Sequence, residues 1–257
     1  IGDISIAGAL SIGAHGSTYP AAGEAVVPGQ SFGSLSNLVL ALTAVVWNDA
    51  AGSYELREFR RSEAEITPLL AHLGRTFVTS VTLQAGANYR VRCQSSTDVP
   101  WRELFAPPGA PGRTFESYVE QHGRVEAIWF PFTETPWLKT WSVSPEKPAE
   151  SREVFGPYPY VFSDSIPEPV TDALAQVASG NQAITPAFGA SQFGAVAAGL
   201  VATDTHDLWG WSKDLMFYLR ATTLRVVAGG GVVVTRRENI AQVIHEFTTW
   251  LHERMTY

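Results

Sequence analysis

Small residues surround a histidine in the segment GAHGSTYP, residues 13–20. Gly13, Ala14 and Gly16 carry little or no side chain, so another molecule is able to lie close to the backbone at this point. The imidazole of His15 would then face a flat group at short range, where a neutral ring nitrogen acts as a nucleophile. A turn histidine without a function is the alternative, and the motif by itself does not decide between the two.

Composition limits the classes of protein to which the chain can belong. The chain has 257 residues, of which 45% are apolar, enough to form a full hydrophobic core. Its net charge of -7 and its lack of a basic run argue against a nucleic-acid partner. The longest apolar stretches, such as residues 38–47, are about half as long as a membrane span, so we expect no integral membrane segment. A single cysteine, Cys93, excludes an internal disulfide and a multi-cysteine site, and we expect no metal.

Apolar and alternating segments predict a strand-rich first part of the chain. The predicted strands are residues 4–10, 38–47, 53–60, 77–84 and 87–94. The turn DAAG at 49–52 joins the second and third of these strands, which should pair as a hairpin. Ser62 and Glu65 have the spacing of a capping box. We expect a helix from there to Leu73, ended by Gly74.

A change in composition, followed by the turn-rich segment PPGAPG at 107–112, places a domain boundary near residue 96. The helices predicted beyond it are residues 115–122, 169–178 and 187–200, with a long amphipathic helix after the capping-box pair Thr235 and Glu238. The predicted strands are residues 124–132, 137–143, 215–227 and 231–235. One face of the last helix should lie in the core, and it carries Ile240, Val243, Ile244, Phe247, Trp250 and Leu251.

Three motifs in the first part resemble the FAD domain of the vanillyl-alcohol-oxidase flavoprotein superfamily. They are ISIAGALSIGAHGSTYP at 4–20, GSLSN at 33–37 and GRTFVTSVTL at 74–83. In that superfamily the glycine-rich segment lies against the flavin ring, and the matching histidine is where many members attach FAD covalently. The resemblance therefore implies FAD attached covalently through His15. It also implies further cofactor contacts at Gly13, Ala14, Gly16, Ser17 and Thr79.

The second part resembles a narrower family. The segment VEAIWFPFTETPWLKTWSV, residues 125–143, is similar to the substrate-domain strand pair of lactone, alditol and sterol oxidases. Residues 102–137, 166–181 and 207–225, which include the string WGWSKD, are similar to the covalent-flavin, or type II, cholesterol oxidases.

This resemblance implies an α+β fold in two parts. Residues 1–95 would form the second half of a FAD-binding domain, with a mixed or antiparallel sheet and a flanking helix. Residues 96–257 would form a substrate-binding domain, incomplete here, of antiparallel sheet covered by helices. The family's pyrophosphate-binding region would precede Ile1 and its Glu-x-Arg strand would follow Tyr257, so we expect an internal portion of a longer chain.

The implied activity is oxidation of the 3-hydroxyl of a sterol such as cholesterol, with O2 reduced to H2O2 and isomerisation to the enone. Seven of the eight tryptophans lie beyond the predicted boundary, which suits a bulky apolar substrate. The expected partners are the sterol and O2, the full-length parent is expected to be a monomer, and a secreted or extracellular location is expected. The alternatives are a sugar-lactone or alditol oxidase of the same superfamily and a non-catalytic lipid-binding module.

Glu126 is the candidate catalytic base, because oxidation of an alcohol needs a group that takes the hydroxyl proton. It begins the segment EAIWFPF, where apolar neighbours would partly desolvate the carboxylate and make it a better proton acceptor. The resemblance also implies an active-site glutamate at this position. A solvent-facing glutamate at a strand start is the alternative. Glu134, in the loop TETP, is expected to be exposed.

Overall fold

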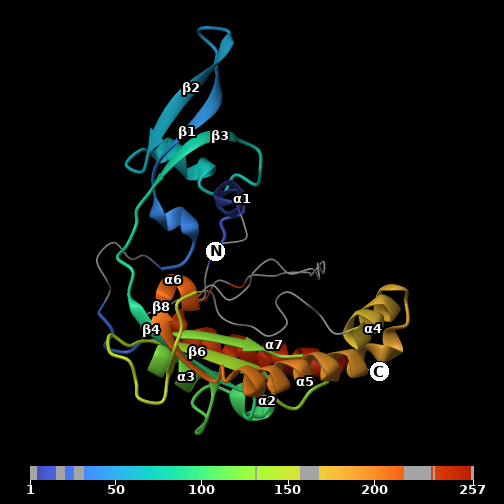
Figure 1. Cartoon of the computed structure of the whole chain (residues 1–257). Helices are drawn as coiled ribbons and strands as arrows, with labels where there is room; N and C mark the ends of the chain where they lie inside the picture. Colours follow the sequence, from blue (N-terminus) through green and yellow to red (C-terminus); the bar gives the residue numbers. More distant parts are fainter. Residues whose placement is uncertain are drawn as a thin grey trace. The chain divides into compact units, whose positions relative to one another are not determined.

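The computed structural model describes residues 5–15, 21–25, 32–130, 132–156, 168–216, 233 and 235–255. The chain divides into two compact units, which we call unit 1 (Ile1–Tyr19 and Glu24–Ala87) and unit 2 (Pro20–Gly23 and Asn88–Tyr257). The division falls earlier than the boundary expected near residue 96, because the strand that follows Asn88 pairs inside the sheet of unit 2. Both units combine antiparallel sheet with helices, which confirms a mixed α+β fold (Figure 1).

The described part of unit 1 holds a three-stranded antiparallel sheet in the order β2-β1-β3. Its strands are β1 (Val39–Asn48), β2 (Ser53–Arg60) and β3 (Phe77–Leu83). The hairpin predicted across DAAG is confirmed by the pairing of β1 with β2. One face of the sheet is buried, with a core of Leu10, Val39, Leu42, Ala44, Phe59 and Ile66.

The first element is a helix, and the strand predicted for residues 4–10 is wrong. α1 spans Ile6–Ser11, and the Oγ of Ser5 caps it by accepting a hydrogen bond of 3.1 Å from the backbone N–H of Gly8. Ala9 and Leu10 are the residues of α1 that are buried. The side-chain cap and the four-residue spacing of Ile6 and Leu10 on one helix face favour this helix over an extended segment.

The helix predicted from Ser62 to Leu73 is also wrong. The structure has a short 3-10 helix, η2 (Ala64–Leu69), with Pro68 inside it. Proline has no backbone N–H and clashes with the preceding turn, so an α-helix does not continue through this position. Glu65 does not serve in a capping box, because its carboxylate binds the guanidinium of Arg57 on β2 at 2.9 Å.

The described part of unit 2 holds a five-stranded sheet in the order β5-β6-β4-β8-β7. Its strands are β4 (Arg90–Ser96), β5 (Arg124–Ile128), β6 (Trp137–Val143), β7 (Arg152–Glu153) and β8 (Asp207–Trp211). All pairs are antiparallel except β7 with β8. The predicted pairing of the strands around 124–132 and 137–143 is confirmed by β5 and β6.

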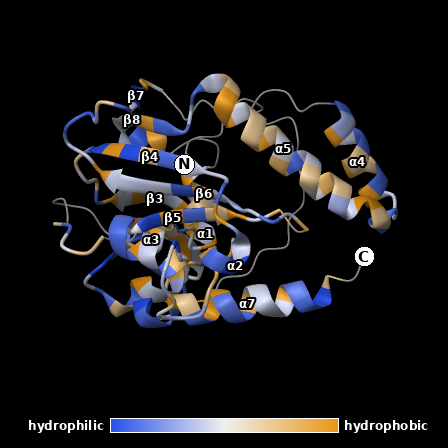
Figure 2. Ribbon diagram, turned by 90° about the horizontal axis from the view of Figure 1, so that it is seen from below, coloured by the Kyte–Doolittle hydropathy of each residue, from blue (hydrophilic) through white to orange (hydrophobic). Residues whose placement is uncertain are grey.

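Helices cover both faces of this sheet (Figure 2). On one face, β4, β6 and β8 form a core with α5 (Thr185–Thr203) and α6 (Ser212–Leu215). The members of that core are Val91, Cys93, Trp137, Trp141, Val154, Val196, Leu200, Leu208 and Leu215. On the other face, residues of β5 and β6 pack with α2 (Trp101–Leu104), α3 (Phe115–His122) and α7 (Ile240–Arg254).

Most of the predicted helices are confirmed, and the start of α3 has a local cause. The hydroxyl of Thr114 caps α3 by accepting a hydrogen bond of 3.1 Å from the N–H of Ser117. α4 (Glu168–Ala178) and α5 match the predicted ranges closely, with η3 (Gln182–Ile184) between them. The predicted strands 215–227 and 231–235 lie largely outside the described residues.

The last helix differs from its prediction. α7 follows a short 3-10 helix, η4 (Arg237–Asn239), and has no side-chain cap. Ile240 and Ile244 pack against the core, whereas Phe247 and Trp250 are 60% and 50% exposed. Phe247 and Trp250 of the predicted apolar stripe therefore lie outside the core, whereas Thr248 between them is buried.

One helical stretch among the described residues, Gln182–Thr203, is long and apolar enough to cross a membrane by length and composition alone. Figure 2 shows the apolar residues along α5. Val196 and Leu200 on this stretch pack into the core of unit 2, and 22% of its apolar window is buried.

Gly210, the glycine of WGWSKD, allows a close approach of two backbone segments. A Cβ at this position would lie 2.8 Å from the carbonyl oxygen of Val154, and the N–H of Val154 donates a hydrogen bond of 2.9 Å to the carbonyl of Trp209. Any side chain at position 210 would push the β7 segment away from β8.

We therefore expect Gly210→Ala to destabilise unit 2 by about 1 to 3 kcal/mol, as overpacked core sites do. Gly194→Ala is the matched control, because a Cβ there meets no heavy atom within 4 Å and Gly194 lies in α5. The control should be neutral or stabilising by up to about 1 kcal/mol. Thermal unfolding followed by circular dichroism measures both, and equal transition temperatures for the two variants would contradict the packing described.

Candidate active site

The described residues around His15 belong to unit 1 and are held by backbone hydrogen bonds. The carbonyl of Ala14 accepts a bond of 2.7 Å from the N–H of Leu35, and His15 forms an antiparallel bridge with Ser34. The hydroxyl of Ser34 donates to the carbonyl of Gly13 at 3.1 Å. The side chain of His15 is exposed, so an imidazole on an ordered backbone faces outward.

Gly13 needs to be glycine in this arrangement. Its φ is +62°, in the left-handed region, and a Cβ would lie 3.3 Å from the Cβ of Ala71. Ser34 also caps η1 (Leu35–Leu38) through its side chain, so the turn at Gly13 and the start of η1 are fixed by the same residue. Gly16 and Ser17, the other predicted cofactor contacts of this segment, lie outside the described residues.

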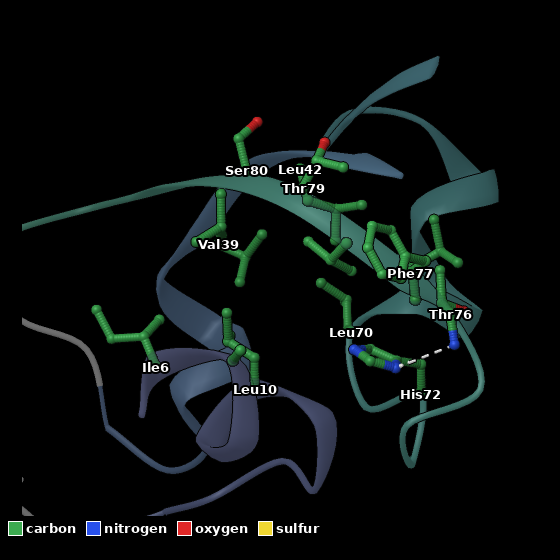
Figure 3. A pocket seen from close by; sticks show the side chains of 14 residues that line it. Ile6, Leu10, Val39, Leu42, Leu70, His72, Thr76, Phe77, Thr79 and Ser80 are labelled. Carbon is green, nitrogen blue, oxygen red and sulfur yellow. Dashed lines mark hydrogen bonds between the residues drawn. The ribbon is translucent and has the colours of Figure 1, made fainter. Parts of the chain in front are cut away.

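Thr79 lies elsewhere in unit 1. Its hydroxyl donates to the carbonyl of Thr43 across β3 and β1 at 3.2 Å. It also lines a pocket of about 420 Å³ whose other walls come from α1, β1, the segment 69–72 and β3 (Figure 3). Gly13, Ala14 and His15 are not among the lining residues. The structure therefore groups those three predicted residues but does not bring Thr79 into the same group.

The walls of this pocket are mostly apolar. Figure 3 shows Ile6, Leu10, Val39, Leu42 and Leu70 around it. His72 is also at the wall, where its Nδ1 accepts a hydrogen bond of 3.4 Å from the N–H of Thr76. These walls suit an apolar or flat group.

Glu126 lies on β5 in unit 2, directly opposite Lys139 on β6. The Nζ of Lys139 is 2.5 Å from the Oε2 of Glu126. The glutamate side chain is 33% exposed, whereas the lysine side chain is 0% exposed. The sequence led us to expect apolar neighbours around this carboxylate, and the structure instead places a buried ammonium against it.

Two tryptophans flank the ammonium of Lys139. Its Nζ is 4.3 Å from the ring centroid of Trp137 and 5.6 Å from that of Trp141. These residues are two positions away on either side along β6, so all three side chains share one face of the sheet. Burial lowers the pKa of Lys139, and the carboxylate of Glu126 raises it in part.

Two more titratable side chains lie on the same face. Cys93, on β4, is fully buried, and burial raises the pKa of its thiol to about 12, so the thiol stays protonated at neutral pH. Arg124, two residues before Glu126, is also buried, with its guanidinium 5.6 Å from the ring centroid of Tyr89. The face of the sheet that bears the candidate base therefore also bears two buried cations, Arg124 on β5 and Lys139 on β6.

Glu134 does not belong to this group. Its side chain is 80% exposed and pairs at 3.4 Å with Arg102, which is also exposed. Among the residues that the structure describes, no three His, Cys, Asp or Glu side chains are placed to hold a metal ion.

Lys139 is the residue at the candidate site that our sequence analysis missed. The string WLKTW contained a usable signal, since a lysine between two tryptophans at two-residue spacing must share a strand face with them. The predicted pairing of residues 124–132 with 137–143 did not specify the register, so Glu126 and Lys139 were not recognised as opposite each other.

Comparison with known proteins assigns the family. Residues 90–257 match the family described as cholesterol oxidase, substrate-binding. A crystal structure of cholesterol oxidase from Brevibacterium sterolicum is 57% identical with a TM-score of 0.93, and a histidine-to-alanine mutant of that enzyme gives 57% and 0.92. Each comparison covers 98% of this chain and 46% of the matched chain.

A solvent-stable cholesterol oxidase is 53% identical with a TM-score of 0.94, over 98% of this chain and 47% of that one. No curated protein matched the sequence. The chain thus spans about half the length of the enzymes of known structure that it matches. On the match over residues 90–257 and these structural similarities, the chain belongs to the cholesterol oxidase family, and those residues form its substrate-binding part.

Proposed function

We propose that the chain is part of a longer FAD-dependent oxidase that oxidises the 3-hydroxyl of a sterol such as cholesterol. The proposal includes reduction of O2 to H2O2 and isomerisation of the product to the enone. The observation that carries it is the match of residues 90–257 to the substrate-binding family of cholesterol oxidases. Identities of 53% and 57% to cholesterol oxidases of known structure support it.

In this proposal unit 1 contributes to the FAD-binding domain and unit 2 is the substrate-binding domain. The described residues fit a covalently held flavin, because an exposed imidazole at His15 follows a glycine turn whose backbone is fixed by Ser34. His15 would hold FAD covalently, with contacts from Gly13, Ala14, Gly16, Ser17 and Thr79. When bound, FAD supplies the acceptor for the hydride of the alcohol carbon and passes the electrons to O2.

The residues of unit 2 bind the sterol and take its proton. The carboxylate of Glu126 accepts the proton of the 3-hydroxyl as the alcohol carbon is oxidised. Ile128, two residues further along the same strand face, and Phe130 beyond it are partly buried apolar side chains that pack against the core. Such side chains are suited to contact the apolar body of a sterol next to a polar reacting group.

The substrate class is tested in the full-length enzyme that contains this chain. Release of H2O2 is measured with cholesterol and with a sugar alcohol at equal concentration. We expect turnover of cholesterol and none of the sugar alcohol, because an apolar pocket does not satisfy the hydroxyl groups of a polyol. Preference for the sugar alcohol would favour the alditol-oxidase alternative. A colourless protein that binds sterol without H2O2 release would favour the lipid-binding alternative.

His15→Ala in the same enzyme tests the attachment. We expect flavin that is released into the supernatant on acid precipitation, since the variant has no imidazole to form the bond. His72→Ala is the matched control within unit 1, and its flavin should stay in the acid pellet. Absorbance at the flavin maximum in pellet and supernatant measures both variants. Acid-stable flavin in His15→Ala would exclude this residue as the attachment point.

Glu126→Gln tests the assignment of Glu126 as the catalytic base. The amide keeps the shape of the carboxylate but does not accept a proton, so flavin reduction by cholesterol should slow by roughly 10^2 to 10^4. Flavin attachment should be unchanged. Glu134→Gln, at an exposed glutamate, is the control and should reduce at the parent rate. Stopped-flow absorbance measures reduction, and a parent-like rate for Glu126→Gln between pH 5 and 9 would show that Glu126 is not the base.

A further inference from the structure

We infer that Lys139 is a positioning residue for Glu126, whose carboxylate its buried ammonium holds in one orientation. The inference rests on the proposed function, in which Glu126 is the base. Lys139 itself would not touch the substrate, because its side chain is fully buried while that of Glu126 is partly exposed.

The ion pair of Lys139 and Glu126 has a buried side and an exposed side. The ammonium contacts the Oε2 of Glu126 at 2.5 Å from inside the core of unit 2, and the exposed fraction of the pair belongs to the glutamate. The antiparallel register places the two residues directly opposite on β5 and β6, so the contact does not depend on a flexible loop. A substrate hydroxyl would therefore meet a carboxylate that is already oriented.

The aromatic neighbours of Lys139 are themselves anchored. The indole Nε1 of Trp137 donates to the hydroxyl of Ser95 at 3.3 Å, and the Nε1 of Trp141 donates to the carbonyl of Leu215 at 3.0 Å. Both rings are buried. Because the rings on the two sides of the lysine are fixed, its ammonium has little freedom to leave the carboxylate.

Stability alone does not explain a lysine at this position. Moving an ammonium out of water costs free energy that a single ion pair often fails to recover, and apolar replacements of buried pairs are often as stable. Burial also lowers the pKa of Lys139, which shows that the surroundings disfavour its charge. A charge kept in such surroundings is explained by what it does to the neighbouring carboxylate.

The other charged and titratable groups around the pair do not replace this ammonium. Arg124 lies on β5 itself and is charged at all relevant pH values, and Cys93 on β4 is a neutral thiol below about pH 12. α5, which packs on this face, contains no titratable residue. On α6, Asp214 is paired with the exposed Lys213 at 2.7 Å. The ammonium of Lys139 therefore remains the charge that the structure places against the Oε2 of Glu126 at 2.5 Å.

Lys139→Met in the full-length enzyme tests the inference, because it keeps the apolar stem and removes the charge. We expect the carboxylate of Glu126 to lose the contact that orients it toward the substrate hydroxyl. The limiting rate of flavin reduction should fall while the KM for sterol changes little. Lys139→Arg, which keeps the charge, should restore much of the limiting rate.

Lys213→Met is the matched control, because it removes an exposed lysine that also contacts a carboxylate. Its limiting rate and its KM for sterol should equal those of the parent. Flavin content shows whether unit 1 of each variant has folded, and circular dichroism of each variant shows whether unit 2 has folded. If Lys139→Met does not fold, Lys139→Gln, which keeps a hydrogen-bond donor without the charge, carries the same comparison.

The double variant Glu126→Gln with Lys139→Met separates the inference from the proposed function. We expect its rate to equal that of Glu126→Gln alone, because Lys139 acts only through the carboxylate. A parent-like limiting rate for the uncharged variant at position 139, beside a slow Glu126→Gln, would overturn the positioning role and leave the base in place. A parent-like rate for Glu126→Gln would overturn the base and the positioning role together.

Discussion

The antiparallel pairing of β6 with both β4 and β5 is the constraint on which unit 2 depends. It places Lys139 opposite Glu126 on one side and Ser95 on the other, and it puts Trp137 and Trp141 on the same face as the lysine. A shift of one residue in either register would move the lysine to the opposite face, among the helices α2, α3 and α7. The register therefore determines which side chains form the core of unit 2, and it places the ammonium of Lys139 within that core.

Much of the fold follows from local pattern. The hairpin of β1 and β2, the pair β5 and β6, and the helices α3, α4 and α5 have alternation, caps or small-residue runs that can be recognised without tertiary contacts. The secondary-structure predictions are wrong where local sequence signals favour different structures for the same segment. Ser5 caps a helix in a segment whose composition also suits a strand. Pro68 lies inside a short 3-10 helix, where the spacing of Ser62 and Glu65 predicts the start of a longer α-helix.

The candidate residues of each unit were less predictable than the fold, because in both units they come from separate segments of the chain. His15 and its small neighbours are contiguous in sequence, so the structure keeps Gly13, Ala14 and His15 together. Thr79, drawn from a separate motif, lies at a pocket that those residues do not line. Lys139 is adjacent to Glu126 only through the ladder between β5 and β6, and composition carries no information about that adjacency.

The tryptophans beside Lys139 give unit 2 an intrinsic optical probe. Excitation of an indole redistributes electron density across its rings, so a cation 4.3 Å from the centroid of Trp137 changes the energy of the emitted light. The emission of Trp137 therefore reports the charge of the neighbouring ammonium, which does not itself absorb at those wavelengths.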